Sequence, residues 1–247
     1  MKCEFSESSY AFSLVSELVR TGELGSIVAA PIAPSTHEEG KEGYDIKLFR
    51  KGKPLFLQFK IPDYIVQKRS SSTSPYDSPF YRVKMWNRQV SDQHNVLKKL
   101  SDANPGTVFY VAPTFHELGK FNLFYMSSSM AKNSAFFSLN NLPFIKDDDD
   151  HHIYYTEPGE YFSAKACFCS EPKNVDGFGF ESVKTLISQL EAVDIDDFCK
   201  TTLIMFREYI GDDESIPSIR PFDDNLSPYY ALQDYLLAFG VSLLFIK

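Results

Sequence analysis

Residues 43 to 60 hold two short apolar runs joined at Lys51–Gly52, and this segment constrains the fold more than any other. Glycine tolerates the positive φ angle of a tight turn, so the pattern predicts a β-hairpin with these two residues as its loop. In that register Asp45 lies opposite Gln58, with Lys60 on the diagonal. Because side chains alternate along a strand, Gln58 and Lys60 are expected on one face. An acid, an amide and a lysine then converge at one end of the hairpin.

A helix is predicted over residues 7 to 21, where apolar side chains such as Leu14 and Leu18 recur at helical spacing. Glu7 falls on the same stripe one turn earlier, and Glu17 sits beside its far end. An acid at the mouth of an apolar face favours a functional role for Glu7. The alternative is that Glu7 only stabilises the positive end of the helix dipole.

Downstream of the hairpin, the sequence predicts a long helix over residues 81 to 102 and a buried strand over residues 107 to 112. Gln93 is the polar exception on the helical stripe, and the adjacent His94 is interpreted as a buried structural histidine. Hairpin, helix and buried strand in this order are typical of an α/β fold.

The second half yields elements but no clear site. The acidic run of residues 147 to 150, followed by two histidines, suggests a metal cluster at first sight. Consecutive acids are more typical of a solvated loop, because metal ligands usually converge from several elements. We expect helical structure over 116–132, strands over 153–155 and 163–170, helices over 181–193, 196–210 and 228–239, and a closing buried strand over 241–246.

The length of 247 residues suits a single α/β domain. The sequence has no apolar run long enough to span a membrane and no visible secretory signal. The four cysteines form no Cys-x-x-Cys pair and are expected to be free thiols. These features predict a cytoplasmic protein with no membrane association.

Charge is distributed unevenly along the chain. Residues 47 to 99 hold twelve basic and three acidic side chains, although the whole chain has a net charge of -8. Such a basic stretch is the footprint of a phosphate-binding surface, or else a solvated basic face. The side chains predicted to contact nucleic acid are Lys68, Arg69, Arg82, Lys84, Arg88 and Gln93.

The polar end of the hairpin suits a divalent metal ion that activates water for phosphodiester hydrolysis. Magnesium prefers oxygen ligands and needs only one or two carboxylates. Lys60 would lie beside the attacking water, or alternatively form a plain ion pair with Asp45. The predicted ligands are the Asp45 carboxylate, the Gln58 amide oxygen, the Phe59 carbonyl, and a second carboxylate from Glu7 or, failing that, Glu39.

The segment Gly43-Tyr44-Asp45, followed by Leu57-Gln58-Phe59-Lys60, resembles the core of the PD-(D/E)xK nuclease superfamily. It is most similar to the Gln-x-Lys variant of Mrr-type restriction endonucleases. The resemblance covers roughly residues 5 to 112. It implies a restriction-endonuclease-like mixed central sheet flanked by helices, with residues 113 to 247 as a C-terminal α+β extension of a single domain. An acid on the first helix is common in the family, which favours Glu7 over Glu17.

The resemblance implies an endonuclease that cleaves DNA with Mg²⁺ or Mn²⁺, in bacterial defence or repair. Gln58 stands where most members have a carboxylate, and this neutral ligand weakens metal binding. The alternative is therefore a catalytically inert interaction module that acts as a subunit of a protein complex. The acidic second half is the predicted contact for a protein partner, and the sequence leaves open whether the chain forms a homodimer.

Overall fold

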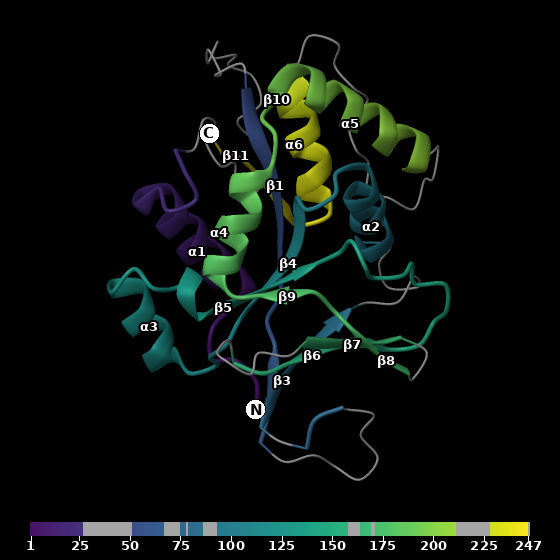
Figure 1. Ribbon diagram of the computed structural model, residues 1–247. Helices are drawn as coiled ribbons and strands as arrows, with labels where there is room; N and C mark the ends of the chain where they lie inside the picture. The colour runs from purple at the N-terminus through teal and green to yellow at the C-terminus, as the bar shows by residue number, and fades with distance from the viewer. Residues whose placement is uncertain are drawn as a thin grey trace.

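Strand β1 (Lys51–Phe59) lies inside the central sheet of the computed structural model (Figure 1). Helices flank this sheet, and a second, antiparallel sheet lies below it in the view. The structure describes residues 1–26, 51–66, 75–77, 79–85, 93–157, 164–168, 171–210 and 228–246.

The central sheet contains both parallel and antiparallel pairs. β1 runs parallel to β4, with Phe56 beside Val108 and Phe59 beside Val111. Its pairings with β10 and β11 are antiparallel. The expected mixed central sheet is therefore confirmed. Its strands are ordered β10 (Val193–Asp194), β1, β4 (Val108–Pro113), β5 (Ser134–Ser138) and β9 (Gly177–Phe178), and β11 (Val241–Ile246) also pairs with β1.

The predicted turn at Lys51–Gly52 is wrong. Both residues belong to β1 and pair with β10. Gln58 has a strand partner on each side, Val241 of β11 and Tyr110 of β4. The predicted register, with Asp45 opposite Gln58, is therefore not the one that β1 adopts. The C-terminal strand offers β1 a continuous apolar partner, and this nonlocal pairing replaces the local hairpin.

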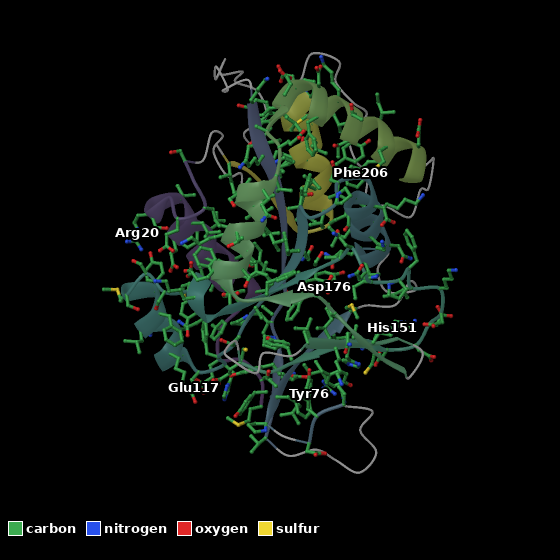
Figure 2. The ribbon with its side chains drawn as sticks, viewed as in Figure 1. Arg20, Tyr76, Glu117, His151, Asp176 and Phe206 are labelled. Atoms are coloured by element: carbon green, nitrogen blue, oxygen red, sulfur yellow. The ribbon has the colours of Figure 1, made fainter. Side chains whose placement is uncertain are left out.

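Helices cover both faces of the central sheet. On one face, Leu55 and Leu57 of β1 pack into an apolar cluster that includes side chains of α1 and α4. On the other face, Phe56 belongs to a cluster that includes side chains of α2, α5 and α6, among them Phe206, labelled in Figure 2. The sequence predicted most of these helices, whose bounds are α1 (Glu7–Thr21), α2 (Gln93–Ala103), α4 (Phe180–Gln189), α5 (Ile195–Ile210) and α6 (Pro228–Ala238).

Helix α1 confirms the first predicted element with its exact bounds. The Ser6 hydroxyl accepts a hydrogen bond from the Ser9 backbone N–H, which caps the N-terminus. Tyr10, Leu14 and Leu18 form the fully buried stripe. The predicted stripe of Leu14 and Leu18 is thus the face of α1 that packs against the central sheet.

A second sheet interrupts the path from β1 to α2. Residues 81–85, predicted as helix, belong instead to strand β3 (Phe80–Met85). Tyr81, Val83 and Met85 are buried, whereas Arg82 and Lys84 are partly exposed, so a strand alternation overrides the helical reading. The antiparallel order is β2 (Asp63–Ile65), β3, β6 (His151–Tyr155), β7 (Ala164–Phe168) and β8 (Glu171–Asn174).

Most of the remaining predictions for the second half hold where the structure describes the chain, but the helix predicted over 181–193 ends at Gln189, and Val193 belongs to β10. Helical structure within 116–132 appears as α3 (Leu118–Met126) and the 3-10 helix η1 (Ala131–Asn133). The closing strand is β11, and all but one of its residues are buried. Cys3, Cys167 and Cys199 are free thiols, and Cys169 lies outside the described residues. Among the described helices, none has the length and apolar character needed to cross a membrane.

Candidate functional site

The carboxyl ends of the parallel strands β1 and β4 meet at one edge of the central sheet. The backbone N–H of Lys60, just past β1, donates to the Val111 carbonyl of β4 at 2.9 Å. Gln58 and Lys60 lie on the face covered by α2 and α6, and Phe59 packs on the other face, against Tyr10 of α1. The predicted alternation of these side chains is confirmed, and it places two polar groups together at this edge.

Lys60 is buried, with 8% of its surface exposed. Its ammonium donates a 2.7 Å hydrogen bond to Oε1 of Gln93, the first residue of α2. It also lies 5.9 Å from the centre of the Tyr110 ring on β4. Burial lowers the pKa of Lys60, and the nearby Glu7 carboxylate opposes that shift. The lysine is thus a buried side chain whose ammonium donates to one amide oxygen and is influenced by the charge of one nearby acid.

Gln58 has one side-chain oxygen that is buried at this site without a hydrogen-bond partner among the described residues. Its side chain is 1% exposed, and its Nε2 donates to the Phe59 carbonyl at 3.2 Å. Its Oε1 accepts no hydrogen bond from any residue that the structure describes. Buried acceptors are rarely left unpaired, because the desolvation is not compensated. Gln58 Oε1 is therefore a candidate ligand atom.

Glu7 reaches the same edge from the first turn of α1. The Ile61 backbone N–H donates to its carboxylate, and Lys60 attracts it. The residue as a whole is exposed, but its carboxyl is shielded enough that burial, the largest effect, raises the pKa of Glu7. Glu7 and Lys60 therefore lie close enough for the charge of each to affect the pKa of the other.

Glu17 has a different role. This residue is 4% exposed, and its carboxylate accepts from the backbone N–H groups of Met130 at 2.7 Å and Ala131 at 3.0 Å. Those groups lie at the start of η1, where N–H groups have no partner within the helix. Glu17 therefore ties α1 to η1, and the preference for Glu7 as the site acid agrees with this arrangement.

Several predicted site residues cannot be placed. Asp45 and Glu39, the other proposed carboxylates, lie outside the described residues. The same holds for three of the predicted nucleic-acid contacts, Lys68, Arg69 and Arg88. Within the described ranges, no group of three or more His, Cys, Asp and Glu side chains is arranged to hold a metal ion.

The remaining predicted nucleic-acid contacts separate in space. Gln93 lies in the site itself, whereas Arg82 and Lys84 lie on the second sheet. Arg82 forms an ion pair with Asp63 at 2.8 Å, and Lys84 forms one with Asp150 at 2.7 Å. Both cations are more than one-third exposed, so neither ion pair buries its charge.

The acidic run before β6 behaves as a solvated loop. Asp148, Asp149 and Asp150 are exposed, and Asp147 accepts from Nε2 of His151 at 2.6 Å. Figure 2 places His151 on the second sheet, away from α1 and α4. The interpretation of this run as a loop is therefore favoured over a metal cluster.

Two groups lie at the site although no pattern in the sequence placed them there. The Phe239 backbone carbonyl accepts a hydrogen bond from Gln93 Nε2. Gly240, which ends α6 with φ +64°, lies against the amides of Gln58 and Gln93. Gly240 directly follows the helix predicted over 228–239, but pattern alone does not place that helix end beside residues so much earlier in the chain.

His94 confirms the structural interpretation made from the sequence. One ring nitrogen is 2.9 Å from the Tyr110 hydroxyl and the other is 2.9 Å from the Pro143 carbonyl. Burial lowers the pKa of His94 to about 4. His94 is therefore a neutral, hydrogen-bonded core residue at neutral pH.

Comparison of the chain with protein-family models, with curated proteins and with solved structures finds no match.

Proposed function

We propose that this protein is a metal-dependent nuclease that hydrolyses phosphodiester bonds of DNA, with a restriction-endonuclease-like core of the PD-(D/E)xK type. The observation that carries the proposal is the cluster of Glu7, Gln58, Lys60 and Gln93 at the carboxyl ends of β1 and β4. Ligands of open α/β sheets bind at such strand ends. A buried lysine with a shifted pKa beside an acid is also typical of functional sites.

The described residues fit a magnesium ion in the type of atom they offer. Gln58 Oε1 is a buried oxygen with no described partner, and Glu7 supplies a carboxylate near Lys60. Magnesium takes hard oxygen ligands and retains several waters, so a small protein ligand set is sufficient. Asp45 and Glu39 remain the proposed further carboxylates. When bound, the ion supplies Lewis-acid charge neutralisation at the phosphate.

Lys60 supplies a fixed positive charge in this proposal. Its ammonium donates to Gln93 and is attracted by Glu7, and both interactions favour the charged form against the effect of burial. A cation held in place before the reaction stabilises negative charge as it develops on phosphate oxygens or on attacking water. Gln93 therefore holds the lysine, and Lys60 acts on the substrate.

Arg82 and Lys84 are proposed to contact the DNA backbone. They lie on β3, which pairs with β2, and β2 begins three residues after Lys60. Their exposed ion pairs contribute little to stability, so a phosphate competes readily for either cation. Such contacts position the duplex without reading its sequence.

The proposal is tested by incubating the purified protein with supercoiled, linear and single-stranded DNA, and with RNA. Reactions contain Mg²⁺, Mn²⁺ or EDTA. We expect cleavage of DNA that requires the metal and is lost in Gln58→Ala and Glu7→Ala. Intact substrates in every reaction, together with calorimetry that detects no Mn²⁺ binding, would contradict the proposal.

A second candidate, an inert interaction module, is favoured by an apolar surface on α1 and α3. Phe12 of α1 is 66% exposed, and Leu123 and Met126 of α3 are 62% and 81% exposed. Exposed apolar side chains on neighbouring helices suggest association with another protein surface. Under this candidate, sedimentation detects self-association that Met126→Glu abolishes, and no nucleic acid is cleaved. A monomer over the whole concentration range would contradict self-association through this surface.

A further inference from the structure

The turn that joins α6 to β11 lies directly against the candidate site. Phe239 contributes its backbone carbonyl, which accepts from Nε2 of Gln93. A Cβ atom at Gly240 would lie 3.6 Å from Nε2 of Gln58 and 3.6 Å from Nε2 of Gln93. The C-terminal segment therefore forms one wall of a site whose other residues come from the first hundred positions.

The hydrogen bonds of Gln93 have a defined direction. A glutamine amide has a donor end, Nε2, and an acceptor end, Oε1. A backbone carbonyl only accepts, so the Phe239 carbonyl selects the donor end of Gln93. The acceptor end is then left to face Lys60, whose ammonium only donates. A rotated amide would present N–H groups to the ammonium, which is unfavourable.

We propose that the Phe239–Gly240 turn is the positioning element for Lys60: its carbonyl orients the Gln93 amide, and Gln93 Oε1 then fixes the lysine ammonium in the site. The catalytic meaning of this inference rests on the proposed nuclease function. The turn itself touches no reacting atom, so its effect is transmitted only through Gln93.

Gly240 is the residue of this turn that can be changed. Its φ of +64° lies in the left-handed region, which glycine adopts without a steric penalty and β-branched residues strongly disfavour. An alanine Cβ would make ordinary contacts at 3.6 Å, so Gly240→Ala fits the space with moderate backbone strain. Gly240→Val adds two methyl groups beside the amides, and it is expected to displace the Phe239 carbonyl.

The test follows the titration of Lys60 by NMR of protein labelled with ¹³C at lysine Cε, and Lys60→Arg assigns the signal. Gln93→Leu removes an acceptor of the charged form, so we expect the pKa of Lys60 to fall by about one unit relative to wild type. Gly240→Val is expected to lower it in the same direction, and Gly240→Ala by a smaller amount. In the double variant Gly240→Val/Gln93→Leu, the pKa falls no further than in Gln93→Leu alone, because the two changes break one chain of contacts.

Gly22 provides a matched control. It ends α1 with φ +60°, and the nearest atom to a Cβ there is the Gly25 carbonyl oxygen at 3.8 Å. Gly22→Val imposes similar backbone strain far from the amides, so it is expected to leave the Lys60 titration unchanged. Gly240→Ala serves in place of Gly240→Val if the latter lacks the circular dichroism of the folded protein.

The inference is overturned if Gly240→Val and Gly240→Ala leave the pKa of Lys60 at its wild-type value, or if their effects add to that of Gln93→Leu. Because the titration does not depend on turnover, it separates this inference from the proposed function. If the Lys60 titration shifts as expected but the protein cleaves no nucleic acid, the positioning role of the turn is retained and the proposed nuclease function is rejected. If cleavage occurs, Gly240→Val is expected to lower kcat by about tenfold or more with little change in KM.

Discussion

Among the described regions that bury charged or amide side chains, two do so in contrasting ways. At the junction of α1 and η1, the Glu17 carboxylate accepts hydrogen bonds from two backbone N–H groups. Both bonds connect α1 to η1. At the carboxyl ends of β1 and β4, Lys60 has one amide acceptor and Gln58 Oε1 has no described partner. A buried polar group that is fully paired stabilises a fold, whereas an incompletely paired one leaves an atom available to a further partner such as a ligand. The first region is therefore structural and the second is the candidate for function.

Lys60→Met separates the two regions with the largest expected effect. Removing the cation is expected to reduce DNA cleavage by about 10³-fold, or about 4 kcal/mol of transition-state stabilisation. Stability should change little or increase, because methionine fills similar space without a buried charge. Cleavage rates and urea unfolding measure the two quantities. Lys98→Met is the control, because Lys98 is also buried, at 7% exposed, but pairs with Asp102 away from the site.

Glu17→Ala is expected to show the opposite behaviour. It leaves two buried N–H groups unpaired and creates space beside η1, so the free energy of unfolding should fall by about 3 kcal/mol. The cleavage rate of the folded fraction should stay the same. Glu17→Gln retains one acceptor oxygen and should lose less. If Glu17→Ala unfolds at the wild-type urea midpoint, the junction is not the structural anchor described above.

The lowered pKa of His94 predicts that the stability of the folded protein depends on pH. Burial holds its pKa at about 4 in the folded protein, against 6.5 for a histidine exposed to solvent, so the unfolded chain binds a proton that the folded chain does not. Stability contributed by neutral His94 is complete above pH 6.5 and is lost as the pH falls towards 4. The loss amounts to about 3 kcal/mol.

Urea unfolding at pH 7, 5.5 and 4 measures this loss. The pKa of His152, also lowered to about 4 and mainly by burial, adds a loss in the same window. The two contributions are therefore separated by measuring how stability depends on pH in His94→Gln and in His152→Gln. A profile for His94→Gln as steep as that of wild type would show that His94 does not carry the effect.

Gln58→Leu is expected to have the smallest effect on stability. It removes an unpaired buried oxygen together with the Nε2 donor to the Phe59 carbonyl, so the two effects offset and the free energy of unfolding is expected to change by less than about 1 kcal/mol. Asn95→Leu, in contrast, should lower the free energy of unfolding by about 2 kcal/mol. The Asn95 side chain forms hydrogen bonds with both the backbone N–H and the backbone C=O of Ile145. Thermal and urea unfolding of both variants decide the point. Equal destabilisation in the two would mean that Gln58 is also a structural amide.

Short-range patterns predicted the elements that carry the site. The apolar stripe with Leu14 and Leu18 defined α1, and the strand period placed Gln58 and Lys60 on one face. The same reasoning failed for residues 81–85, where a helical stripe and a strand alternation overlap in one short segment. It also failed at Lys51–Gly52, because a glycine permits a turn but does not require one.

The sequence by itself determined the local chemistry: a Gln-x-Lys pair at the end of a buried strand, an acid at the start of α1, and a glycine that ends α6. Only the tertiary structure decided that β11 lies beside β1, that Gln93 meets Lys60, and that the Phe239 carbonyl orients Gln93. Periodicity reports how a segment buries its own side chains. Strand pairing is settled by competition among segments far apart in the chain, and here the C-terminal strand occupies the edge of β1 that the sequence had assigned to a neighbour.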